Sequence, residues 1–203
     1  MPLVKREYFI PCSGGECIAI AELIQENIGN CEIAIDIRDN GLYIILYGYK
    51  TDVRNAWARI KKLVKSYRES VKPCREGYRV SVEYIVSKTR KTFPPLLLVE
   101  ILKRMGYPTD YREGYIVSSL DTEEIIGCAD KVASLLQEIR YDVWSTTAKY
   151  FVVAASILSN KEPSIVIEDA IEKGIMYRDE DDRPRLKMEW RQALDKYLGT
   201  WCE

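Results

Sequence analysis

Histidine is absent from this sequence of 203 residues. Its absence removes the commonest general base and the commonest metal ligand, and with them every Ser–His or Cys–His nucleophile pair. The glycine-rich loops that hold nucleotide phosphates are also missing, because neither a Walker sequence nor Gly-x-Gly-x-x-Gly occurs. Gly14-Gly15, at the start of a predicted helix, remains as a candidate for receiving a phosphate. The sequence therefore favours a protein that is not an enzyme and that carries neither a cofactor nor a metal.

Long apolar runs are missing as well. The longest candidate, Tyr150–Leu158, has roughly half the length that a bilayer requires. The first residues contain no apolar core of the length that a signal peptide needs. Gln is scarce whereas Ile, Lys, Glu and Tyr are abundant, a bias typical of hyperthermophiles. We therefore expect a cytoplasmic protein that does not bind membranes.

Six cysteines are present, which is unusual for a reducing cytoplasm but known for intracellular proteins of hyperthermophiles. Cys12, Cys17 and Cys31 lie close together in the sequence, yet no second close pair and no His completes a tetrahedral metal site. A buried thiol or a disulfide is the better interpretation. The best disulfide candidate is Cys12–Cys31, because both residues lie at the ends of neighbouring predicted strands.

Charge is distributed unevenly along the chain. Residues 50–91 contain 13 Lys and Arg against four Asp and Glu, a net charge of +9 in a chain whose total is −1. The segments 1–49, 92–140 and 141–203 carry −4, −3 and −3. A local excess of one sign attracts a polyanion even where the whole chain is almost neutral.

Apolar periodicity predicts the elements of the first half. A strand over residues 7–12 and a helix over residues 18–28 precede an alternating strand over residues 33–37. Asp39-Asn40-Gly41 predicts a tight turn, and residues 42–49 form the return strand. The helix that follows places one set of apolar side chains on a single face: Val53, Ala56, Trp57, Ile60, Leu63, Val64 and Tyr67.

The second half repeats this order. Residues 78–86 alternate as a strand, and Pro95 lies in the first turn of a helix that continues to Met105. Residues 109–119 form a hairpin about Glu113-Gly114. A helix then begins at Asp121, with acids in its first turn that suit the helix dipole. Each half is therefore expected to consist of a strand, a helix, a hairpin and a helix.

The two halves correspond at an offset of 72 residues. Tyr43-Ile44-Ile45 corresponds to Tyr115-Ile116-Val117, and Val53 to Ile125. We therefore predict an α+β protein with two tandem βαββα units, over residues 1–75 and 76–142, of a KH-like or ferredoxin-like kind. An alternative assigns the strand at residues 78–86 to the first unit, so that residues 6–86 form one ferredoxin-like βαββαβ unit.

The remaining residues, 143–203, are expected to form a helical C-terminal region. Helices are predicted over residues 146–159, 164–176 and 184–198, with a charged loop over residues 177–183. The region would form either its own bundle or a cover for a sheet. It is also the candidate surface for a protein partner.

A cationic stripe is predicted beside the apolar face of the helix at residues 50–68. Arg54, Lys61, Lys65 and Arg68 fall within about 60° on the helix, and no acid four residues away is placed to pair with them. A basic turn over residues 87–92 and the tyrosines that flank Gly48 complete the candidate surface. The candidate nucleic-acid-binding residues are Lys50, Arg54, Lys61, Lys62, Lys65, Arg68, Lys88, Arg90, Lys91, Tyr47 and Tyr49.

Two resemblances accompany these residues. The strand that ends at Gly48, followed by a helix with Val53, Ala56 and Ile60, resembles the end of a KH domain, which implies RNA binding. The Gly-x-x-Gly loop of KH domains is missing, so no nucleotide-clamping residue is carried over. The overall layout, with Lys91-Thr92-Phe93-Pro94-Pro95 and Met105-Gly106-Tyr107, is similar to an uncharacterised conserved archaeal protein family, which implies an archaeal origin.

These features favour a non-catalytic RNA-binding protein, possibly one associated with a ribonucleoprotein or the ribosome. Three alternatives stay open. The protein could be an interaction or scaffold subunit of a cytoplasmic complex. The cationic stripe could instead dock on the acidic C-terminal region of the same chain, or it could bind an acidic protein partner.

Overall fold

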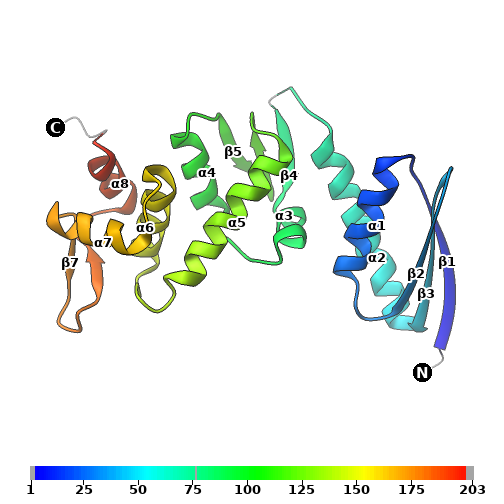
Figure 1. Cartoon of the computed structure of the whole chain (residues 1–203). Helices are drawn as coiled ribbons and strands as arrows, with labels where there is room; N and C mark the ends of the chain where they lie inside the picture. Colours follow the sequence, from blue (N-terminus) through cyan, green and yellow to red (C-terminus); the bar gives the residue numbers. More distant parts are fainter. Residues whose placement is uncertain (1–2, 76, 200–203) are drawn as a thin grey trace. The chain divides into compact units, whose positions relative to one another are not determined.

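The structure is a computed structural model that describes residues 3–75 and 77–199. It divides into two compact units, Met1–Pro73 and Cys74–Glu203, and each unit is described by itself. The described residues form eight helices and three small antiparallel sheets (Figure 1). The α+β class predicted from the sequence is therefore confirmed.

The first unit contains a three-stranded sheet and two helices. Its elements in chain order are β1 (Leu3–Pro11), α1 (Gly15–Asn27), β2 (Glu32–Arg38), β3 (Gly41–Tyr49) and α2 (Lys50–Val71). The strand order is β1-β3-β2, and both neighbouring pairs are antiparallel. Strands β2 and β3 form the predicted hairpin. Gly41 is needed there because its φ is +149° and a Cβ on it would collide with the carbonyl oxygen of Ile10.

Alternation along the strands gives this sheet two different faces. One face carries Leu42, Ile44 and Leu46 of β3, which are completely buried in a core with apolar residues of α1 and α2. In Figure 1 both helices lie on this side of the sheet. The opposite face carries Tyr47 and Tyr49, which are exposed. Burial of one face against two helices is the usual way in which so small a sheet is stabilised.

The second unit begins with a comparable arrangement. Its elements are β4 (Tyr78–Ser81), α3 (Val82–Thr89), α4 (Pro95–Arg104), β5 (Thr109–Arg112), β6 (Tyr115–Ser118) and α5 (Thr122–Glu138). The strand order is β4-β6-β5, again antiparallel throughout. In both units the first strand therefore pairs with the third, and the third pairs with the second.

The predicted strand over residues 78–86 is wrong beyond Ser81. Ser81 ends the strand because its side-chain oxygen accepts a hydrogen bond from the backbone N–H of Tyr84 (3.1 Å), which caps helix α3. The apolar alternation continues into this helix and imitates a strand. The alternative ferredoxin-like unit over residues 6–86 is also wrong, because β4 pairs with β6 of the second unit.

The C-terminal region is not entirely helical. Its elements are α6 (Thr146–Ser159), α7 (Pro163–Glu172), β7 (Met176–Arg178), β8 (Pro184–Leu186) and α8 (Trp190–Leu198). The last predicted helix therefore starts six residues late, since its first residues form a hairpin with β7. Helix α6 packs against α4 and α5, which joins this region to the second unit. Its separation into a domain over residues 143–203 stays a prediction.

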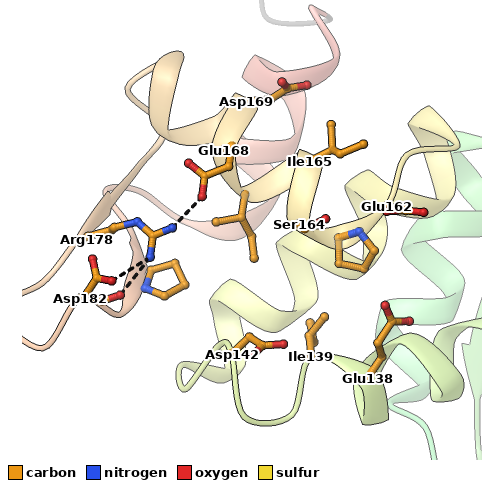
Figure 2. A pocket seen from close by; sticks show the side chains of 13 residues that line it. Glu138, Ile139, Asp142, Glu162, Ser164, Ile165, Glu168, Asp169, Arg178 and Asp182 are labelled. Carbon is orange, nitrogen blue, oxygen red and sulfur yellow. Dashed lines mark hydrogen bonds and ion pairs between the residues drawn. The ribbon is translucent and has the colours of Figure 1, made fainter.

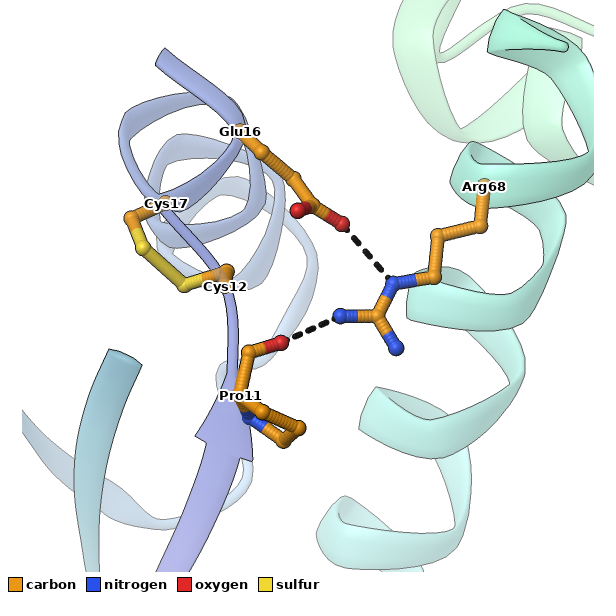
Figure 3. The surroundings of a disulfide bond; sticks show 5 residues. All are labelled: Pro11, Cys12, Glu16, Cys17 and Arg68. Carbon is orange, nitrogen blue, oxygen red and sulfur yellow. Dashed lines mark hydrogen bonds and ion pairs between the residues drawn. A yellow bond between two sulfur atoms is a disulfide. The ribbon is translucent and has the colours of Figure 1, made fainter. Parts of the chain in front are cut away.

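A disulfide lies at the junction of β1 and α1. It joins Cys12 to Cys17, so the predicted Cys12–Cys31 pairing is wrong (Figure 3). Cys17 lies in the first turn of α1, which brings its sulfur back to the end of the strand, whereas Cys31 has a free thiol. Burial and the neighbouring Asp52 both raise the pKa of that thiol. Across the described residues, no helix is both long enough and apolar enough to cross a membrane.

Candidate nucleic-acid interface

Helix α2 carries the candidate surface. The packing of its apolar side against the sheet determines which of its residues face solvent. Val53, Ala56 and Ile60 are buried against the sheet, as the apolar spacing predicts. Trp57 lies partly buried at the edge of this core, where its ring stacks on that of Tyr8 in β1 at a centroid distance of 4.0 Å. These contacts fix the rotation of α2, and so decide which of its residues face solvent.

The solvent side of α2 is strongly cationic. The helix contains seven Lys and Arg against two Asp and Glu, a net charge of +5. Six of the seven cations are exposed, all except Arg68. Four of these six are named here the α2 cationic row: Arg54, Lys61, Lys62 and Lys65. The row extends over about 16 Å of helix, from the usual rise per residue. Within the described part of the chain, Arg54, Lys61 and Lys62 make no ion pair.

Two residues of the predicted stripe, Lys65 and Arg68, have acidic partners. Lys65 lies 3.8 Å from Glu69, so the expectation that no acid pairs with the stripe is wrong at this position. Lys65 is exposed and Glu69 is partly exposed, however, and such surface pairs contribute little stability. The spacing of four residues could have revealed Glu69 in the sequence.

Arg68 has a structural role near the disulfide. Its Nε donates to Glu16 (2.8 Å), and its guanidinium also donates to the carbonyl oxygen of Pro11 (Figure 3). Glu16 lies 52 residues away in the sequence, so no local pattern predicts this contact. Arg68 thus holds the β1–α1 junction against α2 and does not belong to the α2 cationic row.

The two predicted tyrosines lie apart from the row. Tyr47 and Tyr49 are 42% and 50% exposed on the sheet face opposite to α2. Tyr49 also immediately precedes Lys50, the exposed first residue of the helix. The structure therefore does not place the ring of Tyr47 beside the cations. The separation of Tyr47 from α2 could have been predicted from the strand period of two, because Leu46 and Tyr47 must point to opposite faces of the sheet.

The other predicted cations belong to the second unit. Lys88 lies in the last turn of α3, and Arg90 is the exposed left-handed residue that ends this helix. Lys91 is largely engaged, since its Nζ donates to Asp130 (2.8 Å) and to Ser134 (2.9 Å) of α5. The predicted basic turn is therefore mostly the end of a helix.

An acidic hollow of about 680 Å³ lies in the C-terminal region (Figure 2). Six acids line it together with one cation, Arg178, which pairs with Glu168 (2.6 Å) and Asp182 (3.4 Å). The acids are Glu138, Asp142, Glu162, Glu168, Asp169 and Asp182. A hydrogen bond from Lys161 lowers the pKa of Asp169, which keeps this carboxylate ionised. The hollow repels phosphates and suits a basic group instead.

The chemistry available to these surfaces is ionic. The described residues contain no group of three or more Cys, Asp and Glu that could hold a metal ion. Lys and Arg in a row provide donors for phosphate oxygens, which is how proteins bind nucleic acid without reading its sequence.

The comparisons with known proteins agree with the archaeal resemblance. The profile of a family described as "Uncharacterized protein conserved in archaea (DUF2067)" matches residues 12–195. A protein of Methanocaldococcus jannaschii, described as uncharacterized protein MJ0388, is 26% identical over 160 residues, which cover 75% of this chain and 73% of that protein. No solved structure matches the chain significantly. Because the profile spans most of the chain, the protein belongs to this conserved archaeal family.

Proposed function

We propose that the protein is a non-catalytic, cytoplasmic RNA-binding protein, and that it associates with a ribonucleoprotein or the ribosome. One observation carries the proposal: the α2 cationic row exposes four Lys and Arg on one helix, and only Lys65 among them has an acidic partner within the described residues. A thermophilic surface would be expected to mix both signs into ion-pair networks. A row of unneutralised cations instead fits a polyanionic ligand.

The proposal includes a finer assignment of the fold. We infer that both units are KH-like or ferredoxin-like, because each has a three-stranded antiparallel sheet with helices against one face. In the second unit, Lys88 and Arg90 lie at the junction of α3 and α4. A KH domain clamps the RNA backbone with a short loop. Here cationic side chains would take over that role, since the Gly-x-x-Gly sequence is missing.

Binding through phosphates has a measurable consequence. Each phosphate contacted on a single strand changes the slope of log affinity against log salt by about −0.7. Four contacts from the α2 cationic row would therefore contribute a slope of about −2.8. Specificity for sequence should be weak, because phosphate contacts position the RNA and base contacts specify it.

The test compares two doubly substituted proteins that lose the same charge. Arg54→Ala/Lys61→Ala removes two members of the α2 cationic row, and Lys187→Ala/Lys196→Ala removes two exposed cations of the C-terminal region, outside α2. Affinity for a fluorescent 20-nucleotide RNA of mixed sequence is measured by anisotropy between 50 and 300 mM salt. We expect the slope to become shallower by about 1.4 for the first protein. A similar change in both proteins, or no binding by the wild type at low salt, would refute the proposal.

A second candidate function is an interaction or scaffold subunit of a complex. Tyr141 and Trp144, between α5 and α6, are 78% and 61% exposed, and exposed aromatics are typical of protein interfaces. The acidic hollow adds a surface for a basic segment of a partner. Binding of an arginine-rich peptide that is lost in Glu162→Gln/Glu168→Gln, together with absence of RNA binding, would favour this function.

A further inference from the structure

The sheet of the second unit has a face for which the sequence analysis predicted no function. Val80 and Ile116 pair across β4 and β6 and are completely buried, so their neighbours in sequence point to the other side. That side carries Arg79, Tyr115 and Val117, together with Asp110 and Arg112 of β5. We call it the open face of the second sheet.

Cations surround two adjoining hollows on this face. The hollows measure about 660 and 550 Å³ and share Arg112 and Val117 in their linings. Four cations line them: Arg75, Arg79, Lys103 and Arg112. The acids are Asp110 and Glu113, and Asp110 is occupied by Arg112 at 2.8 Å. The hydrogen bond from Arg112 lowers the pKa of Asp110. The described residues that line the two hollows therefore carry a net charge of +2.

A stacked pair lies at the centre of the face. The guanidinium of Arg79 lies 3.9 Å from the centroid of the Tyr115 ring. Arg79 is exposed and Tyr115 is partly exposed, so both groups remain accessible from solvent. Unpaired RNA bases stack on aromatic rings and on the planes of arginine guanidinium groups. The pair thus provides a flat surface within reach of the cations.

The corresponding face of the first unit shows that this combination is not general to the fold. Arg38 lies over Tyr43 there, at 4.2 Å. Arg38 is nevertheless neutralised by Asp36 at 2.7 Å, and Lys5 lies 3.5 Å from Glu7. Glu32, opposite Tyr47, lies on the same face, so its described residues carry three acids and two cations. The described residues that line the open face of the second sheet have an excess of cations instead.

We propose that the open face of the second sheet binds a single-stranded segment of RNA. Arg75 and Lys103 would contact its phosphates, and the Arg79–Tyr115 pair would hold an unpaired base. The inference rests on the proposed RNA-binding function and adds a second contact surface of different chemistry. The α2 cationic row binds phosphates of any RNA, while this face selects RNA whose bases are not paired.

The experiment measures affinity for two RNA probes of the same length, a single strand of 20 nucleotides and a duplex of 20 base pairs. Arg75→Ala/Arg79→Ala alters the face. The control Lys187→Ala/Lys196→Ala removes two exposed cations of the C-terminal region, with the same change in charge. Arg79→Lys keeps the charge but removes the planar group, and circular dichroism confirms that each protein is folded.

We expect the face variant to lose at least about fivefold in affinity for the single strand, the low end of what stacking one base contributes. Its affinity for the duplex should fall no more than that of the control. Arg79→Lys should reduce the preference for the single strand by a similar factor. If both probes weaken equally, or if the face variant behaves as the control does, the inference is wrong.

The outcomes separate this inference from the function on which it rests. If the wild type binds neither probe at 50 mM salt, the proposed RNA-binding function fails and this inference fails with it. If the wild type binds and only substitutions in the α2 cationic row weaken binding, the function stands and the open face of the second sheet is not an RNA site.

Discussion

Helices α2 and α5 occupy the same place in their units but carry opposite charge. Each follows the hairpin of its unit, and the apolar positions agree at the offset of 72 residues: Val53 and Ile60 of α2 correspond to Ile125 and Val132 of α5, and all four are buried. The net charge of α2 is +5, whereas that of α5 is −3. The fold therefore fixes the apolar positions and leaves the charge of this helix free.

The two helices also differ in what lies on their outer side. Lys61 of α2 is exposed, whereas its counterpart Ala133 in α5 is 1% exposed, and α5 packs against α6. The C-terminal region thus covers part of the second unit's helical side, while α2 keeps exposed cations at the equivalent position. A surface that the fold does not require, and that carries one sign of charge, is best explained by a ligand.

Reversing the charge of α2 is the strongest test of this comparison. Arg54→Glu/Lys61→Glu/Lys65→Glu gives α2 the sign of α5. Three phosphate contacts would be lost, so affinity for RNA at 50 mM salt should fall by more than about hundredfold. Stability should change by less than about 1 kcal/mol, because the positions are exposed and off the apolar face. Thermal unfolding measures the second expectation, and a large loss of stability would show that the fold does depend on this charge.

The disulfide is expected to contribute to the stability of the first unit and not to that of the second. Only the first unit contains one among the described residues, and its two cysteines are five residues apart. Closing so short a loop corresponds to about 2 kcal/mol in the chain-entropy relation. Cys12→Ser/Cys17→Ser should therefore lower the denaturant midpoint of the first unit and leave that of the second unchanged. Alkylation without reductant should label at most four of the six cysteines, and six labels would contradict the bond.

The start of α5 offers a smaller effect. Asp121 accepts a hydrogen bond from the N–H of Glu124 (2.8 Å), and the Glu124 side chain accepts one from the N–H of Asp121. Helix α2 begins without a side-chain cap of this kind at Tyr49. Asp121→Ala should cost about 1 kcal/mol, and the loss should appear in unfolding of the second unit. Tyr49→Ala serves as the control, for which no loss of a cap is expected.

The smallest effect is expected on the sheet of the first unit. Arg38→Ala removes a guanidinium from above Tyr43, as Arg79→Ala does above Tyr115. Because Arg38 is already paired with Asp36, its removal should change affinity for single-stranded RNA by less than about twofold. Equal losses for the two substitutions, measured by anisotropy, would remove the distinction between the two sheet faces.

Much of the architecture could be predicted from the sequence because it depends on local patterns. The hairpin about Glu113-Gly114, the helix over residues 146–159 and the apolar face of α2 follow from turn residues and periodicity. The end of the strand at Ser81 could not be predicted in this way. The apolar alternation continues past Ser81, although the Ser81 cap starts a helix there.

The sequence predicted which cations make up the candidate site, but it did not predict which acidic side chains pair with them. The cations of α2 follow from the helical period, and the structure exposes Arg54, Lys61 and Lys62 as expected. The contacts of Arg68 with Glu16 and of Lys91 with Asp130 join residues 52 and 39 positions apart. Such contacts depend on how elements pack, which no local spacing encodes.

The salt dependence of RNA binding tests the central claim most directly. The affinity of the wild type for the 20-nucleotide single strand is measured between 50 and 300 mM salt, beside that of Arg54→Glu/Lys61→Glu/Lys65→Glu. The account predicts a log–log slope steeper than about −2 for the wild type, and a slope that is shallower by about 2 for the variant. A wild type that binds with a slope near zero, or a variant with an unchanged slope, would contradict it.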